Sequence, residues 1–501
     1  MATLAGVRDD WSEGQPRRGG TFVFVALLVA LIAIGLGLTV YPTLALLAAL
    51  PPGLLAVNWV ARQPVRGFYI LIAATLVFEI FPLGFPDSLT DKVPFFLNLN
   101  NSNSSAGLSG IPISPAEILM LAVGVIWLFG RVSKRDVALV GGPVVSAYGI
   151  FMLVIVAGEI HGVGLSHGDW LKSLWELRPQ IYGFAAFLMA TNLVTDRRQI
   201  RLLIGLGFLA IGFKVVIALY RYFVTLHGSD SNYEAIMAHE ESYFFALFVL
   251  GTIAALIWGR NIRRPIIALL LAGSAGAFFA MVVNHRRAAE LALIAGVAVI
   301  LALAIRFDDE RRGLWLGLTV LTVTVVIIFT IGYWNHTTGL TGELVRPIRS
   351  MFVPDQRDYL SNIYRVAEDA NILATFRTSP LLGTGFGIPM IVIFPMADIS
   401  YIYPLWNYIP HNTLLWIGMR LGAVGWAVFF GLIGMAILQA CRQLATRKDS
   451  LINPLAAFAV AAIVAEIIQG YSDLQLDSDR NLIILGAILG LINRLPMLAD
   501  E

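Results

Sequence analysis

A histidine near the start of an apolar stretch is the first candidate for chemistry. The segment that begins Pro410-His411-Asn412 predicts a helix over residues 411–438, with the imidazole of His411 in its first turn. Helix N-termini carry unpaired N–H groups and a partial positive charge, which favour a neutral imidazole. A neutral imidazole can accept a proton, so His411 is a candidate general base. The alternative is that His411 and Asn412 only mark the water-facing end of the helix.

Two adjacent arginines follow the apolar stretch of residues 265–283. A guanidinium can bind phosphate oxygens through two parallel N–H bonds, and a charge held this close to hydrocarbon is costly. Arg286 and Arg287 are therefore candidates for binding a diphosphate. Glu290 lies four residues after Arg286, and pairing of these two side chains on one helical face is the alternative.

Other charged residues near the ends of predicted spans have weaker support. Arg178 and Arg221 are expected at the same depth as Arg286, where they could assist it or could anchor their spans by snorkelling. Glu240 lies at the start of a predicted span and either contacts acceptor hydroxyl groups or caps the helix.

Three aspartates near the C-terminus raise the question of a metal site. Asp473, Asp477 and Asp479 could hold a divalent cation, but Arg480 could pair with one of them instead. We expect chemistry that needs neither a bound metal nor another cofactor.

The elements that must position these residues are membrane-spanning helices. The mean hydropathy is +0.76, and apolar stretches of about 20 residues recur, as membrane spans require. The predicted fold class is all-α, a polytopic membrane protein of about 14 transmembrane helices with a large, partly helical extracytoplasmic loop. The predicted spans are residues 21–39, 42–60, 67–84, 113–130, 137–157, 179–194, 200–222, 240–259, 265–283, 287–305, 313–334, 411–438, 452–470 and 479–495.

Basic residues predict which ends of these helices face the cytoplasm. Arginines and lysines gather in the N-terminal tail and in alternate short loops, whereas all 7 histidines fall on the other side. The positive-inside rule then places both termini in the cytoplasm and His411 outside it. The predicted organisation is a cytoplasmic tail (1–20), transmembrane helices 1 to 11 (21–334), an extracytoplasmic catalytic loop (335–410), transmembrane helices 12 to 14 (411–495) and a cytoplasmic tail (496–501).

The loop of residues 335–410 is too long to be a simple turn, and loops of that length are usually functional. Apolar residues recur at three- and four-residue intervals from 357 to 376, which predicts an amphipathic helix along the membrane surface. Arg357 and Arg365 lie on this predicted helix. The sequence Pro-Leu-Leu-Gly-Thr-Gly-Phe-Gly follows at residues 380–387 and is equally compatible with a plain turn and with a ligand-binding loop.

The order of these features resembles the C-terminal signature of the O-antigen ligase and polymerase superfamily. The resemblance covers about residues 286–425 and is carried by the surface helix, the glycine-rich sequence, His-Asn-Thr-Leu-Leu at 411–415 and Leu-Gly-Ala-Val-Gly at 421–425. It implies an integral membrane glycosyltransferase that takes a glycan from an undecaprenyl-diphosphate carrier. It also implies that His411 is the signature histidine of the family and that outer arginines bind the diphosphate.

We therefore predict metal-independent, inverting glycosyl transfer that polymerises O-antigen or exopolysaccharide repeat units. His411 would take the proton of the acceptor hydroxyl group, while Arg286, Arg287, Arg178 and Arg221 would bind the diphosphate and Asn412, Arg357, Arg365 and Glu240 would orient acceptor or sugar. A ligase that transfers glycan to lipid A core stays open, because the outer loops lack the paired Arg and Gly spacing of some family polymerases. The alternative of another class is a transporter of small anions or lipid-linked sugars.

The expected location is the bacterial inner (plasma) membrane, with the active site on its outer face. The expected partners are an undecaprenyl-diphosphate-linked glycan, a glycan or lipid-linked acceptor, membrane lipids and other polysaccharide assembly proteins. A net charge of +2 gives no reason to expect a nucleic-acid partner.

Overall fold

The computed structural model describes the chain in segments, namely residues 58–80, 90–91, 93, 95–98, 113–133, 138–228, 235–337, 339–400 and 403–498. These residues form helices and no strands. The α-helices are α3 (Val65–Val77), α4 (Pro115–Ser133), α5 (Pro143–Glu159), α6 (Trp170–Leu193), α7 (Arg197–Tyr220), α8 (His239–Trp258), α9 (Arg264–Val283), α10 (Arg287–Phe307), α11 (Arg312–Gly332), α12 (Gly339–Arg349), α13 (Gln356–Thr378), α14 (Thr413–Thr446), α15 (Ile452–Gly470) and α16 (Asp479–Leu498).

Ten helices of the described part are long and apolar enough to cross a membrane. They are α4, α5 with its π-helical extension to Leu165, α7 with its extension to Thr225, α8, α9, α10, α11, α14, α15 and α16. The predicted span 21–39 and nearly all of 42–60 lie outside the described residues, so the total of about 14 stays a prediction.

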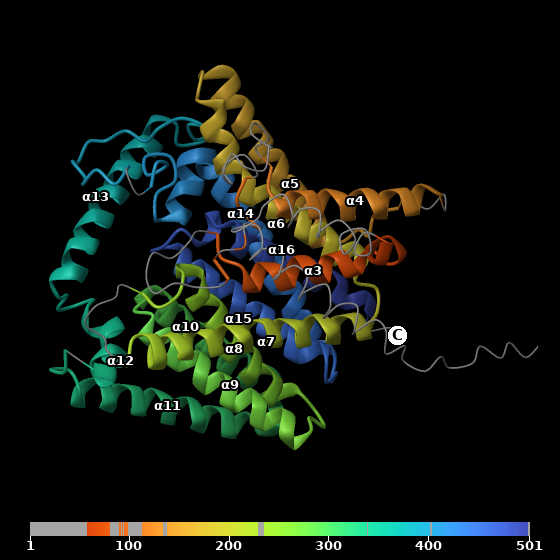
Figure 1. The fold of residues 1–501 in the computed structure, drawn as a ribbon, viewed down its shortest axis with the longest axis vertical. Helices are drawn as coiled ribbons and strands as arrows, with labels where there is room; N and C mark the ends of the chain where they lie inside the picture. The colour runs from red at the N-terminus through yellow and green to blue at the C-terminus, as the bar shows by residue number, and fades with distance from the viewer. Residues whose placement is uncertain are drawn as a thin grey trace, which may run out of the picture.

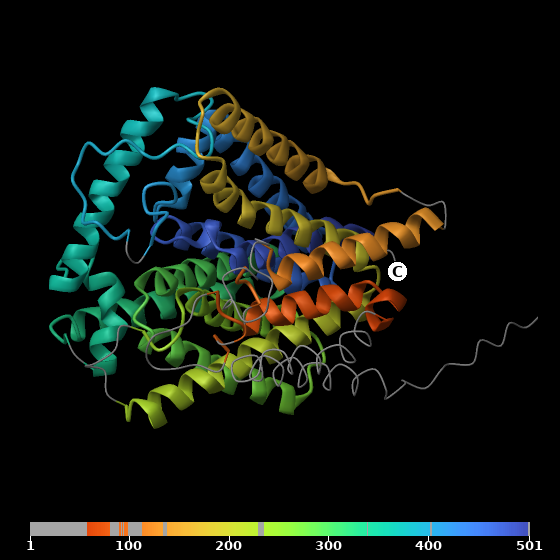
Figure 2. The ribbon, with the colours of Figure 1, turned by 45° about the horizontal axis from the view of Figure 1, so that its top comes forward.

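The spanning helices form a bundle that is crossed at one end by α13. In Figure 1, α3, α4, α7 and α11 run in roughly one direction, and α13 runs across that direction. The rotated view in Figure 2 gives the same arrangement. Helix α16 packs along α6, and α15 packs along α10, so the last helices of the chain fill the middle of the bundle. We call the end that carries His411 the His411 end.

Several charged side chains inside the bundle form ion pairs. Lys214 of α7 contacts Glu79 and Glu241, and Nη2 of Arg480 lies 2.7 Å from Oε1 of Glu241. Arg480 therefore pairs with a glutamate of α8 and not with one of the neighbouring aspartates. Removing one partner of such a pair would leave an uncompensated buried charge, which is strongly destabilising.

The helix after His411 is broken, which differs from the continuous helix predicted over 411–438. Gly422 has a φ of 66°, so α14 consists of a short first part, residues 413–421, and a longer second part. The glycine-rich loop fills the break. The N–H groups of Thr384 and Gly385 donate to the carbonyls of Met419 and Arg420 at 2.8 and 3.0 Å.

The glycine-rich sequence thus has a structural explanation. Gly385 has a φ of 77°, and a Cβ there would overlap the backbone of Gly162 in the extension of α5. A Cβ at Gly422 would overlap the backbone of Leu381. Only glycine allows this conformation and this close approach of backbones. The sequence was compatible with a plain turn or a ligand-binding loop at residues 380–387. In the structure, this segment is a loop that docks on the protein's own main chain.

Candidate active site

His411 is held by a glutamate of α13. Nδ1 of His411 lies 3.1 Å from both carboxylate oxygens of Glu368, and the backbone N–H of His411 donates to Oε2 at 3.0 Å. The Glu368 side chain is only 1% exposed, whereas the His411 side chain is 27% exposed. An ionised carboxylate can only accept, which assigns the hydrogen to Nδ1 and leaves Nε2 as the nitrogen that can take up a proton. The ring of Tyr364 packs edge-on against the imidazole.

His411 itself precedes the helix, which corrects its predicted place in the first turn. Asn412 is the N-cap of α14, and its Oδ1 accepts the N–H of Leu415 at 3.1 Å. The amide of Asn412 also donates to Oδ1 of Asp369 at 3.1 Å. Two consecutive residues of α13, Glu368 and Asp369, therefore fix two consecutive residues at the start of α14.

Asp369 is a titratable group next to this pair. Burial raises the pKa of the Asp369 carboxyl to about 6, and the negative charge of Glu368 acts in the same direction. The hydrogen bond from Asn412 and the charges of Arg365 and His411 oppose this shift. Arg365 therefore lies in the same electrostatic neighbourhood as His411.

A second cationic group faces the same region from α10. Arg286 is the N-cap residue of that helix. Burial alone would raise the pKa of the Asp473 carboxyl, but His239, whose Nδ1 is 3.9 Å from Oδ2, together with Arg286 and Arg365, lowers it below its usual value. Asp473, in the loop between α15 and α16, therefore lies within the electrostatic reach of both Arg286 and Arg365.

Arg287 has a different environment from Arg286. Its Nη1 donates to Oγ of Ser350 at 2.9 Å, and its Nε lies 3.4 Å from Oδ1 of Asp358. Arg346 of α12 donates to the same carboxylate at 2.8 and 3.1 Å. Two guanidinium groups therefore converge on Asp358 and fasten the start of α13 to α10 and α12.

The other predicted diphosphate ligands also contact groups of the protein. Arg178 donates to both carboxylate oxygens of Glu117 at 3.0 and 2.9 Å. Arg221 lies in the π-helical extension of α7, and its Nη1 is 3.2 Å from Sδ of Met237. Neither contact includes a residue of the Glu368 and His411 pair.

Two predicted sugar ligands remain. Glu240 accepts a hydrogen bond from Oγ of Ser478 at 3.4 Å. Arg357 belongs to α13, and its side chain lies outside the described part of the chain.

The short first part of α14 is held in place by a buried ion pair. Nε of Arg420 donates to Oε1 of Glu176 at 2.6 Å, and Nη2 donates to the carbonyl of Tyr408 at 2.8 Å. Glu176 also accepts the indole N–H of Trp416 at 3.2 Å and the backbone N–H of Gly387 at 2.7 Å. Arg420 therefore pairs with Glu176 of α6. This pair ties the glycine-rich loop and the segment before His411 to the bundle.

Two of the three aspartates of the metal hypothesis, Asp473 and Asp479, have different surroundings. Asp473 lies with His239, and Asp479 lies in the electrostatic neighbourhood of Arg178 and Glu117. Among the described residues, no group of three or more His, Cys, Asp or Glu side chains is arranged to hold a metal ion.

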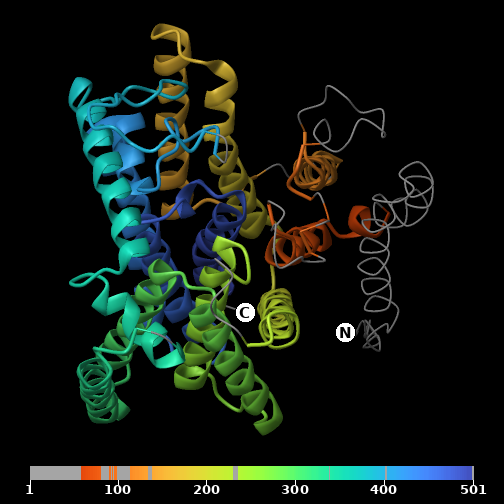
Figure 3. The same ribbon diagram turned by 60° about the vertical axis from the view of Figure 1, so that its left-hand side comes forward.

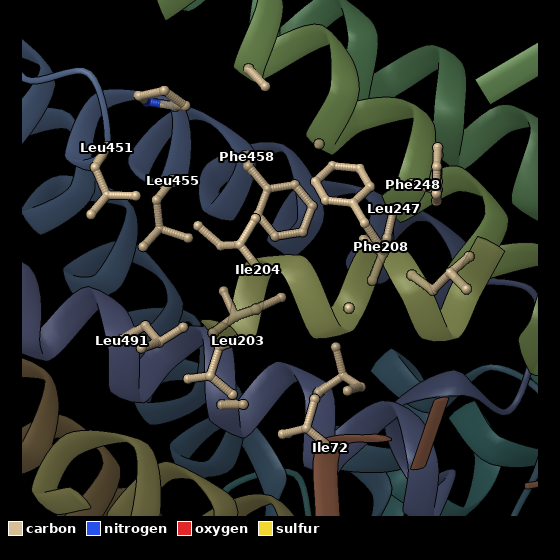
Figure 4. Close-up of a pocket in the computed structure, with 18 of the residues that line it drawn as sticks. Ile72, Leu203, Ile204, Phe208, Leu247, Phe248, Leu451, Leu455, Phe458 and Leu491 are labelled. Carbon is tan, nitrogen blue, oxygen red and sulfur yellow. The ribbon is translucent and has the colours of Figure 1, made fainter. Parts of the chain in front are cut away.

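An apolar cavity of about 270 Å³ lies elsewhere in the bundle. Figure 4 shows its lining by Ile72, Leu203, Phe208, Phe248, Leu455 and Leu491, which come from α3, α7, α8, α15 and α16. None of the candidate site residues lines it. Its lining is almost entirely apolar, so the candidate site remains at the His411 end.

The fold and the site define a class of protein, a multi-pass helical membrane protein with a histidine, a carboxylate and arginines gathered at one end. Residues 272–430, from α9 into α14, match the family model described as O-antigen ligase. This match confirms the resemblance to the O-antigen ligase and polymerase superfamily, and it supports an inner-membrane protein that acts on lipid-linked glycans. No curated protein matches the chain.

Sequence reasoning missed Glu368, Asp369 and Glu176. A signal for the first two was present, because Arg365, Glu368 and Asp369 recur at three- and four-residue spacing on the predicted surface helix. Only the apolar face of that helix was interpreted. Glu176 carried a weaker signal, as a carboxylate just before the predicted span 179–194.

Proposed function

We propose that the protein is a glycosyltransferase that takes a glycan from an undecaprenyl-diphosphate carrier and polymerises O-antigen or exopolysaccharide repeat units. The observation that carries this proposal is the hydrogen-bonded pair of Glu368 and His411. Arg365 acts electrostatically on the neighbouring Asp369, and both Arg365 and Arg286 act on Asp473. Transfer from a diphosphate requires a base for the acceptor hydroxyl group and fixed cations near the leaving group. A histidine held by a carboxylate and nearby arginines could supply both.

In the proposed reaction, Nε2 of His411 takes the proton of an acceptor hydroxyl group as its oxygen attacks the anomeric carbon. The new C–O bond forms while the bond from that carbon to the diphosphate breaks, and attack from the opposite side inverts the configuration. Glu368 stabilises the imidazolium that results, as a buried carboxylate does beside a catalytic histidine. Arg286 and Arg365 neutralise the charge that develops on the leaving undecaprenyl diphosphate.

Within this proposal, two predicted ligands have positioning roles. The guanidinium of Arg287 contacts Asp358 and Ser350, so it orients α13, and that of Arg178 contacts Glu117. Asn412 caps α14 and fixes its start against Asp369. The active site opens on the outer face of the inner membrane, both termini are cytoplasmic, and neither a metal nor another cofactor takes part.

A ligase is the second candidate, because the matching family model is described as O-antigen ligase. The two differ in their acceptor, which is a second lipid-linked glycan for a polymerase and lipid A core for a ligase. A transporter would leave the Glu368 and His411 pair without a use.

The test uses the purified full-length protein in vesicles that contain an undecaprenyl-diphosphate-linked oligosaccharide and an excess of chelator. A polymerase yields a ladder of longer lipid-linked chains without a second acceptor, whereas a ligase yields product only when lipid A core is added. The His411→Ala variant is the control. Movement of intact oligosaccharide across the membrane without a new glycosidic bond would establish the transporter instead, and strict dependence on added Mg²⁺ or Mn²⁺ would overturn the metal-independent mechanism.

A further inference from the structure

Helix α13 has its polar face turned inward and its apolar face turned outward. Asp358, Glu368 and Asn371 are buried against the rest of the protein. On the opposite side, Ile363 and Val366 are 49% and 70% exposed. Tyr359, Leu360 and Leu373 continue this stripe at helical spacing and are also exposed. We call these five outward residues the apolar edge of α13.

The apolar edge continues a surface that belongs to a membrane-spanning helix. The turn before α13 exposes Met351, Phe352 and Val353, and Phe352 is 73% exposed. The ring of Phe352 packs against Trp334, with centroids 6.2 Å apart. Trp334 lies two residues after the end of α11, a spanning helix whose apolar side chains are mostly exposed. Tryptophan at the end of a span is typical of the membrane interface, so the apolar edge begins at interface depth.

The direction of α13 fits the same depth along its whole length. In Figure 1 it runs across the direction of α3, α4, α7 and α11, which is the orientation of a helix parallel to the membrane plane. In Figure 3, where those helices are seen more nearly end-on, α13 runs along the margin of the bundle. A helix in this position can bury one face among lipid headgroups and upper acyl chains.

We propose that the apolar edge of α13 lies in the lipid leaflet at the His411 end and that the leaflet thereby sets the rotation of α13 about its own axis. Burial of Tyr359, Leu360, Ile363, Val366 and Leu373 in lipid directs the opposite face, with Glu368, towards His411. The membrane surface therefore acts as a positioning element for the site. Two other occupants of this surface, a second copy of the chain and water, are distinguished by the experiment below.

The experiment places single cysteines on the apolar edge. Cys441 is the chain's 1 cysteine, so Cys441→Ala gives a cysteine-free background. In it, Ile363→Cys and Val366→Cys report on the edge, and Asp398→Cys, an exposed polar position in the following loop, is the matched control. Each cysteine carries an environment-sensitive fluorophore, and the full chain is reconstituted in phosphatidylethanolamine and phosphatidylglycerol vesicles with and without nitroxide-labelled lipid.

The proposal expects nitroxide lipid to quench the labels at 363 and 366 and to leave the label at 398 unchanged. Quenching of 363 and 366 by aqueous iodide in place of nitroxide lipid would overturn it. Protection from both quenchers, with cross-linking between copies, would overturn it in favour of a second copy of the chain. These outcomes are independent of catalysis, so they stand apart from the proposed function.

A second measurement tests the positioning role and rests on the proposed function. The double variant Ile363→Ser and Val366→Ser changes only exposed side chains, and we expect it to lose transfer in vesicles while its thermal stability in detergent is unchanged. Unchanged transfer together with lipid quenching at both positions would remove the positioning role. The same pair of serines should leave transfer of the His411→Ala variant at its background.

Discussion

Glu368 holds His411 at two points, because its carboxylate lies 3.1 Å from the ring Nδ1 and also accepts the backbone N–H of the same residue at 3.0 Å. The first contact fixes the tautomer of the imidazole, and the second fixes the position of the main chain. The two residues are 43 positions apart in the sequence, so the pair joins α13 to the start of α14.

The first prediction concerns this pair. Glu368→Gln keeps an oxygen for the backbone N–H but can present an amide donor to Nδ1, which disfavours the reactive tautomer. We expect the turnover rate to fall by about 10²–10⁴-fold, as for the loss of general acid–base catalysis, with little change in binding of the lipid-linked donor. Glu368→Asp should recover part of the rate. A Gln variant with normal turnover would show that Glu368 has no part in the chemistry.

The second prediction separates the two adjacent arginines. Arg286→Ala should lower turnover by about 10²–10³-fold, the effect of removing a group that stabilises transition-state charge, and Arg286→Lys should restore only part of it. Arg287→Ala should act through α13. Because Arg287 contacts Asp358, we expect the Arg287→Ala and Asp358→Ala effects on stability to couple by about 1 kcal/mol in a double-mutant cycle. Additive effects would argue that Arg287 does not fasten α13.

The third prediction tests the broken helix. Gly385→Ala and Gly422→Ala force a side chain into a positive-φ position against backbone atoms, and each should destabilise the protein by about 1–3 kcal/mol. Gly431→Ala, in the second part of α14 with nothing within 4 Å of an added Cβ, is the control. It should be neutral or slightly stabilising. Equal thermal midpoints for all three variants would contradict the docking of the loop.

The fourth prediction concerns pH. The pKa of Asp369 is raised to about 6 in the folded protein, so the folded state binds this proton more tightly than the unfolded state does. The stabilisation is present at low pH and is lost as pH rises through about 6. Asp369→Asn should therefore be more stable than the wild type at pH 8, on the order of 1 kcal/mol after allowance for solvent screening, and closely similar at pH 4. Thermal midpoints across this range provide the measurement, and a variant less stable at pH 8 would contradict it.

The fifth prediction concerns sidedness. A cysteine at Ser379 should react with an impermeant thiol reagent added from outside, whereas the native Cys441 should not, because basic residues surround the far end of α14. A cysteine at Ser102, which lies outside the described residues, is expected to react as well. Labelling of Cys441 from outside would reverse the assigned orientation.

Much of the helical framework could be predicted because hydropathy is a local property. Residues 240–259, 265–283, 287–305, 452–470 and 479–495 were predicted as spans and correspond closely to α8, α9, α10, α15 and α16. The break in α14 could not be predicted in this way, since residues 413–446 are mostly apolar on both sides of it and the reason for the break is a loop that docks from outside the helix.

The same distinction between local sequence features and contacts of distant segments applies to the site. His411 and Arg286 could be found because each lies at the end of an apolar stretch, where a charged or titratable side chain is conspicuous. The partner of His411 could not be assigned, because the contact with Glu368 depends on how α13 crosses the bundle. The different environments of Arg286 and Arg287 had no local signal either. Adjacent residues on a helix point in directions about 100° apart, and only the positions of α12 and α13 decide which one meets a carboxylate.

The ion pair of Arg420 and Glu176 has a consequence for the synthesis of the protein. Glu176 belongs to α6, and its partner Arg420 is synthesised 244 residues later. Before Arg420 is synthesised, the ion pair that holds the first part of α14 cannot form. The carbonyls of Met419 and Arg420, which accept hydrogen bonds from the glycine-rich loop, are also still missing. A nascent chain that stops before α14 therefore leaves the buried carboxylate of Glu176 without its partner, which is costly inside the bundle.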